Sequence, residues 1–97
     1  MGVKHGRDYE LILQELTNAM AAVEDSYLFF EMEPQEWDRL SAEEKHEVLE
    51  ALAEDLFYGL GTESVIPVGS SVVIYAPEEH RIHVLVGEQE LTFVSLV

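Results

Sequence analysis

Apolar positions recur at helical spacing from Ser41 to Gly61, the longest such pattern in the chain. At about 100° per residue, these positions form one narrow stripe along a helix. The stripe consists of Ala42, Leu49, Leu52, Ala53, Leu56 and Leu60, flanked by Val48 and Phe57. Ser41 and Glu44 have the spacing of a capping box, and Gly61 stands where a left-handed residue commonly ends a helix. The pattern predicts a central helix whose stripe is covered by the rest of the chain.

A second helical pattern begins after Asp8, a typical N-cap residue, and continues to about Glu24. Its apolar face comprises Tyr9, Ile12, Leu16, Ala19, Met20 and Val23. We expect residues 1–7, which precede the cap, to be loose, because chain ends are poorly ordered unless something holds them. The pattern predicts the first of two main helices.

The segment between the two helices is ambiguous. The aromatic run from Tyr27 to Met32 suits a short strand, the interpretation that we favour, but it also fits a continuation of the first helix. Pro34 is expected to open a single helical turn that carries Trp37. Trp37 is then interpreted as a lid over the helix junction rather than as a ligand-binding side chain.

After Gly61 the apolar pattern changes to the alternation of β-strands. The predicted strands are Val65 to Val68, Val72 to Tyr75, Arg81 to Val86 and Gln89 to Leu96. Gly87 and Glu88 match a two-residue type II′ turn between the last two strands. The expected cross-strand pairs are Val84 with Leu91, Ile82 with Phe93, Ile74 with Ile82, and Val72 with Val84.

Both hairpins then place apolar residues on the same face of the sheet. That face consists of Val72, Ile74, Ile82, Val84, Leu91 and Phe93. It is expected to pack against a helical set made of Leu49, Leu52, Leu56, Ile12 and Leu16. The predicted fold class is α+β, with two main helices packed on one face of an antiparallel meander sheet of three to four strands. Residues 1–97 are interpreted as a single small domain.

The opposite face of the predicted sheet is more apolar than a solvent-exposed face should be. Its apolar members are Val73, Tyr75, Leu85, Val94 and Leu96. A contiguous exposed apolar patch is uncommon on a monomer. We therefore expect this face to be covered by another segment or by a second copy of the chain, and these five residues are candidate contacts of a homodimer.

The composition limits the classes of partner. With 20 acidic and 5 basic residues the formal net charge is −15, which repels nucleic acids and anionic membranes and favours a cationic partner. Apolar residues make up 47% of the chain, so a folded domain is expected despite the charge. The absence of cysteine excludes disulfides and thiolate catalysis. No secretory signal core and no membrane-spanning apolar run occur, and we expect a cytoplasmic protein.

Four glutamates fall together on the side of the central helix opposite its apolar stripe. They are Glu43, Glu47, Glu50 and Glu54, and Tyr58 lies among them. Such a row is commonly just the solvated side of a helix. It also fits a docking surface for a basic protein. The hypothesis that we favour is a non-enzymatic interaction module or inhibitor, for instance one that mimics the charge of a nucleic acid.

No sequence motif indicates catalysis, a cofactor or a metal. His46, His80 and His83 lack the spacing of a metal site, because residues three apart on a strand point to opposite faces. The objection to the pair of His80 and His83 weakens if His80 lies in a turn, and Glu78 and Glu79 could then be considered as additional oxygen ligands. We predict no catalytic residue, no cofactor and no metal ligand.

Two alternatives to the interaction module stay open. One is a small enzyme or ligand-binding protein with a pocket between helices and sheet, to which Glu31, His46 or Trp37 would contribute. The other is a structural subunit that mainly self-associates.

Overall fold

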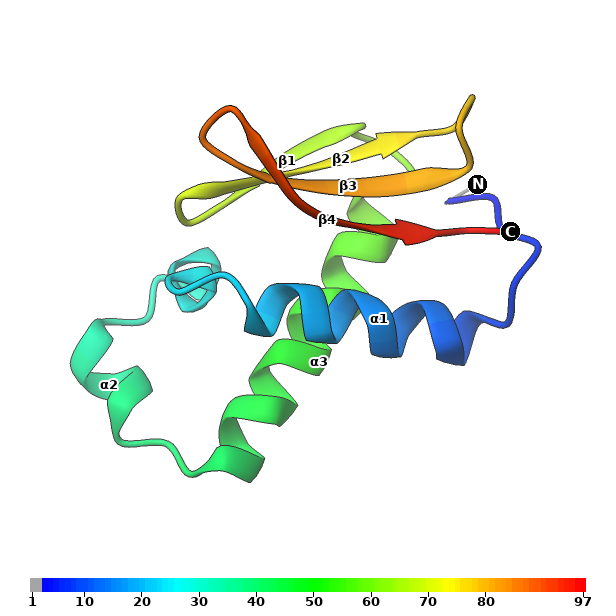
Figure 1. Cartoon of the computed structure of the whole chain (residues 1–97). Helices are drawn as coiled ribbons and strands as arrows, with labels where there is room; N and C mark the ends of the chain where they lie inside the picture. The colour runs from blue at the N-terminus through cyan, green and yellow to red at the C-terminus, as the bar shows by residue number, and fades with distance from the viewer. Residues whose placement is uncertain (1–2) are drawn as a thin grey trace.

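A computed structural model describes residues 3–97 and has an α+β fold, which confirms the predicted class (Figure 1). The helical elements are α1 (Tyr9–Ala21), the 3-10 helix η1 (Ser26–Phe30), α2 (Pro34–Asp38) and α3 (Ala42–Gly59). The strands are β1 (Val65–Val68), β2 (Ser71–Ala76), β3 (Arg81–Val86) and β4 (Gln89–Ser95). They form one antiparallel sheet in the order β1-β2-β3-β4.

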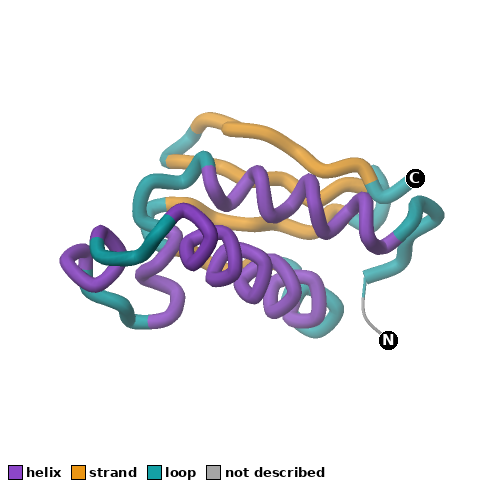
Figure 2. The backbone as a smooth tube through the Cα atoms, turned by 90° about the horizontal axis from the view of Figure 1, so that it is seen from below, coloured by secondary structure: helices purple, strands orange, loops and turns teal. Residues whose placement is uncertain are grey.

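The two main helices, α1 and α3, lie side by side on one face of this sheet (Figure 1, Figure 2). The start of α1 meets the end of α3, where the rings of Tyr9 and Phe57 are 5.1 Å apart. The largest fully buried side chains come from all three components: Ile12, Leu16 and Met20 of α1; Leu52 and Leu56 of α3; Val73, Ile82, Val84 and Val94 of the sheet. Within residues 3–97, no helix is both long enough and apolar enough to cross a membrane.

The N-cap of α1 is Asp8, as predicted, and its carboxylate accepts a hydrogen bond from the Glu10 amide at 3.2 Å. The preceding segment is not loose over residues 3–7, contrary to expectation. Val3 is 6% exposed and joins the core, and the Gly6 amide donates to the Leu96 carbonyl at 2.7 Å. Contacts with the last strand therefore hold this segment. The part of the expectation that concerns Met1 and Gly2 lies outside the described residues.

The central helix, α3, begins as predicted. Ser41 and Glu44 form the capping box: the Glu44 amide donates to the Ser41 hydroxyl and the Ser41 amide to the Glu44 carboxylate. Its end differs, because Leu60 is a right-handed C-cap and Gly61 is not in the left-handed region. The predicted apolar stripe is largely confirmed, since Leu49, Leu52, Ala53, Leu56, Phe57 and Leu60 are buried, although Ala42 is exposed.

The segment from Tyr27 to Met32 is neither the predicted strand nor a continuation of α1. It lies in η1, where the Leu28 amide donates to the Asp25 carbonyl, and Glu31 ends the turn with φ of 59°. The predicted turn at Pro34 is α2, and Trp37 packs against the core and stacks on Tyr27 with ring centroids 5.4 Å apart. The aromatic run therefore covers the helix junction instead of adding a strand.

All four strands occur where predicted, but two of the predicted registers are wrong by one residue. The β2–β3 turn contains four residues, which pairs Val73 with Val84 and leaves Ile74 opposite His83. His80 at φ of 56° accommodates this longer turn. The β3–β4 hairpin begins with the expected pair of Val86 and Gln89, and Gly87 has the positive φ that its turn requires. The register then shifts at a β-bulge that contains Leu91.

Because a slip of one residue reverses the faces of a strand, the predicted core face is wrong on β2 and at Phe93 of β4. It is correct on β3, whereas Leu91 of β4 lies on the side of α1 but is 43% exposed. Ile82 and Val84 are buried, whereas Val72 and Ile74 are on the outer face with Phe93, which is 43% exposed. Most of the residues predicted for self-association lie on the inner face of the sheet instead of the outer face. Val73, Val94 and Leu96 lie in the core beneath the helices, Tyr75 packs against it, and only Leu85 stays on the outer face.

Candidate functional site

The acidic helix surface, as we call the row of Glu43, Glu47, Glu50, Glu54 and Tyr58, lies on the solvent side of α3. All five residues are exposed, and Tyr58, at 71%, is the most exposed large hydrophobic side chain among residues 3–97. The opposite side of the same helix is anchored by fully buried Leu52 and Leu56. A rigid helix thus presents the row of carboxylates, because its backbone geometry is fixed by the core and by the capping box.

Within residues 3–97, the acidic helix surface has little positive charge to balance it. Its only ion pair there is between His46 and Glu50, whose atoms are 3.6 Å apart, and His46 is charged only when protonated. Glu10 and Gln14 of α1 face the same groove between the helices, which has a volume of about 290 Å³. One further carboxylate, that of Glu10 on α1, therefore lines the groove beside the acidic helix surface.

The field of these carboxylates acts on a neighbouring phenol. The pKa of Tyr9 is raised, first because burial disfavours the phenolate and then because Glu54, Tyr58 and Glu10 add negative charge nearby. Burial is the larger cause, and the two carboxylates add to it because nearby negative charge disfavours the phenolate. Glu54 of α3 and Glu10 of α1 therefore both lie near the junction between the start of α1 and the end of α3.

The acidic residues are unevenly distributed between the helical layer and the sheet. Of the 20 acidic residues, 16 lie between Asp8 and Glu63, a segment with only two basic residues, which gives it a formal charge of −14. Residues 64–97, which form the sheet, hold four acidic residues and one arginine, a charge of −3. The helical layer therefore carries nearly all of the net charge.

The residues proposed for a pocket between helices and sheet are not brought together. His46 lines the groove between α1 and α3, Trp37 stacks on Tyr27, and Glu31 is exposed at the end of η1. The ammonium of Lys45 is 5.5 Å from the centroid of the Trp37 ring. Tyr27 and Lys45 are thus structural partners of Trp37 within the chain.

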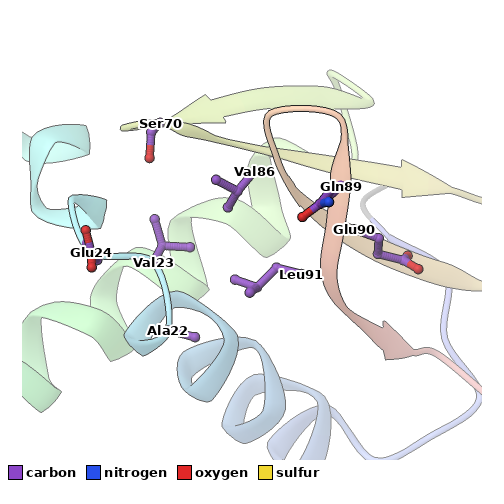
Figure 3. Close-up of a pocket in the computed structure, with 8 residues that line it drawn as sticks. All are labelled: Ala22, Val23, Glu24, Ser70, Val86, Gln89, Glu90 and Leu91. Carbon is purple, nitrogen blue, oxygen red and sulfur yellow. The ribbon is translucent and has the colours of Figure 1, made fainter.

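A cavity does occur between a helix and the sheet, but it contains none of those residues. It has a volume of about 360 Å³ and lies between the end of α1 and the β3–β4 hairpin (Figure 3). Val23, Val86 and Leu91 gather around its centre, with Ser70 and Gln89 farther out. Leu91, which lines the cavity, belongs to the β-bulge of β4, and no simple sequence signal marked that bulge.

A charged cluster on the outer face of the sheet was foreseen only in part, because the sequence analysis considered His83 and Glu79 but not Glu90. His83 lies between two carboxylates, with Nε2 2.7 Å from Glu79 and Nδ1 in contact with Glu90. The hairpin turn at Gly87 and Glu88 was the available signal, because it places Glu90 beside Leu85, on the same face as His83. Within residues 3–97, no three such side chains have an arrangement that could hold a metal ion.

This cluster gives a pH-dependent prediction. The pKa of His83 is raised, first by its hydrogen bond with Glu90 and next, against the opposing effect of burial, by Glu79. A raised pKa means that the stabilisation is complete below the unfolded value of about 6.5 and is lost as the pH rises through the folded value. We expect His83→Gln to lower the free energy of unfolding by about 1 kcal/mol at pH 5.5 and by less at pH 8.5.

Denaturant unfolding of the wild type and the variant at the two pH values measures this difference. The titration of carboxylates elsewhere affects both proteins equally and cancels in the comparison. A loss of stability that is equal at both pH values would show that His83 acts through packing alone.

Comparison with known proteins finds no matching family model, no similar curated protein and no similar solved structure. The function is therefore argued from the surfaces of this chain.

Proposed function

We propose that this protein is a non-enzymatic interaction module or inhibitor that presents the acidic helix surface to a basic partner protein. The observation that carries the proposal is a row of four exposed glutamates on one helix, of which only Glu50 has an ion-pair partner, His46, among residues 3–97. A partner with a basic surface would be attracted over a distance and oriented by this row. Tyr58 adds an exposed amphipathic ring, a residue type that is enriched in interfaces.

The charge distribution supports the same class of partner. The −14 helical layer would repel nucleic acids and anionic lipids more strongly than the net charge alone suggests, because the carboxylates are concentrated on one side. A protein surface that normally binds nucleic acid is complementary to such a layer. An inhibitor that occupies that surface is the specific form of this proposal.

Binding of a small ligand is a less supported alternative. The cavity beside Leu91 gives it a location, but the carboxylates and histidines expected to do chemistry lie elsewhere. A cavity lined by both apolar and polar residues also fits the side chain of a protein partner.

The test is affinity capture from a cell extract with wild-type protein and a fourfold charge-reversed variant. The variant changes Glu43, Glu47, Glu50 and Glu54 to Lys. We expect the wild type to retain a basic protein at about 50 mM salt. At about 500 mM salt it should retain much less, because the Debye length shortens. The charge-reversed variant should retain none.

A matched control changes Glu24, Glu63, Glu78 and Glu88 to Lys, exposed glutamates outside the acidic helix surface. Both variants alter the net charge by the same amount. A difference in capture between them therefore shows that the position of the charges matters, and not only their number. Circular dichroism confirms that each is folded. Equal capture by the two variants would exclude the acidic helix surface as the binding site.

A further inference from the structure

The outer face of the sheet, directed away from the helices, carries mostly apolar side chains, with a few charged ones on β3 and β4. Its positions follow from the observed pairs, which place Val65 beside Ile74 and Ile74 beside His83, with Phe93 next in line. Val65 is 50% exposed and Phe93 43% exposed, and none of the described residues 3–97 forms a helix over this face (Figure 1). An antiparallel sheet with one solvated face normally carries polar residues there. This face departs from that pattern.

The charged groups of the outer face are balanced. Glu79 and Glu90 hold His83 between them, and the Arg81 guanidinium lies 4.3 Å from the centroid of the Phe93 ring. When His83 is protonated, two negative and two positive groups are present. A strongly basic partner would be drawn to the −14 helical layer instead. The outer face fits a partner that is itself apolar and nearly neutral at the contact.

Pairing at the edges of the sheet is obstructed. Pro67 removes a donor from β1, and the bulge at Leu91 interrupts β4. Beyond the bulge, the carbonyls of Ser95 and Leu96 already accept hydrogen bonds from the Arg7 side chain and the Gly6 amide. Face-to-face packing of two sheets remains the available mode of association.

We infer that the outer sheet face binds the same face of a second copy of the chain, forming a symmetric dimer. In such a dimer the sheets lie about 10 Å apart and the helical layers face outward on opposite sides. Each layer of the fold adds about 10 Å, so roughly 30 Å separates the two −14 layers, beyond the Debye length of about 8 Å at physiological salt. Association through the helices would bring those layers together. The sheet contact also leaves the acidic helix surface of both copies free.

The dimer and the capture of a basic partner respond to salt in opposite ways. Salt screens the repulsion between two chains of charge −15 and so strengthens self-association, whereas it weakens binding to a cation. Four short strands make a small interface, and we expect a dissociation constant on the order of 10 µM. Sedimentation velocity over a range of protein concentrations should show a mass approaching twice 11.0 kDa, with a larger dimer fraction at higher salt.

Two variants locate the contact. Ile74→Glu and Leu85→Glu each place a carboxylate on the outer face and should give a folded monomer, with the dissociation constant raised at least tenfold. The control Ala51→Glu adds the same charge at an exposed position of α3 and should leave the dimer in place. A wild type of 11.0 kDa at every concentration and salt level would overturn the inference, as would dimerisation unaffected by both outer-face variants.

A milder change serves if those variants do not fold. The chain has no cysteine, so Ile74→Cys introduces a single reactive thiol on the outer face, and Ala51→Cys introduces one on α3. A short bifunctional maleimide should link two copies of Ile74→Cys rapidly and two copies of Ala51→Cys slowly. Equal linking rates would overturn the inference. The inference would also be overturned if the wild type were monomeric and its Ile74→Glu variant no longer captured another protein. The outer face would then bind that partner and not a second copy.

Discussion

Leu52→Ala is expected to lower the free energy of unfolding by about 2–5 kcal/mol, because it leaves a cavity at a site that is fully buried. Leu52 lies in the middle of α3, on the buried stripe that belongs to the common core of the helices and the sheet. Because protein interiors are close-packed, the surrounding side chains fill such a space only in part. Since small domains are stable by only about 5–15 kcal/mol, a large share of the total would be lost.

Urea unfolding followed by circular dichroism measures this change. Leu11→Ala is the matched control, because it deletes the same atoms from a helical leucine that is 48% exposed. We expect the control to lose less than about 1 kcal/mol. If Leu52→Ala also lost less than about 1 kcal/mol of unfolding free energy, Leu52 would not be buried in the core as the structure has it.

Local signals in the sequence were sufficient to locate most of the elements. The Asp8 cap and the capping box of Ser41 and Glu44 fix two helix starts through bonds between near neighbours. The apolar alternation located all four strands. The end of α3 was less certain, because Gly61 was expected in a left-handed conformation that the chain does not use. Such ends depend on what the following residues contact.

The registers depended on features that local patterns do not contain. A three-residue and a four-residue turn at Pro77 both align apolar residues on neighbouring strands, since Val72, Val73 and Ile74 are all β-branched. Which of these three β-branched residues faces inward is decided only by how the sheet packs against the helices. The same limit applied to the proposed contact residues: Val73 and Val94 were placed on the surface because the face was inverted.

The acidic helix surface was predictable because a single helix carries it. Glu43, Glu47, Glu50 and Glu54 share one side whatever the helix packs against, provided that its apolar stripe is buried. The cluster of Glu79, His83 and Glu90 and the cavity at Leu91 join separate strands and turns. Their recognition required the correct hairpin geometry, including the bulge.

The neighbouring valines of β2 provide a direct test of the register. Val73→Glu is expected to leave little folded protein, because Val73 is fully buried and an isolated carboxylate there would have to be desolvated or forced into its neutral form. Val72→Glu, one residue earlier, places the same side chain on the outer face and should keep the domain folded. We expect the two free energies of unfolding to differ by at least about 3 kcal/mol.

Circular dichroism and denaturant unfolding at about 1 µM protein, a concentration at which we expect self-association to contribute little, measure that difference. The sequence-based register predicts the reverse order, with Val72 in the core and Val73 outside. A stable Val73→Glu beside an unfolded Val72→Glu would therefore restore that register and reverse the faces of β2. It would also return Val73 to the surface and remove Ile74 from the outer sheet face, on which the proposed dimer depends.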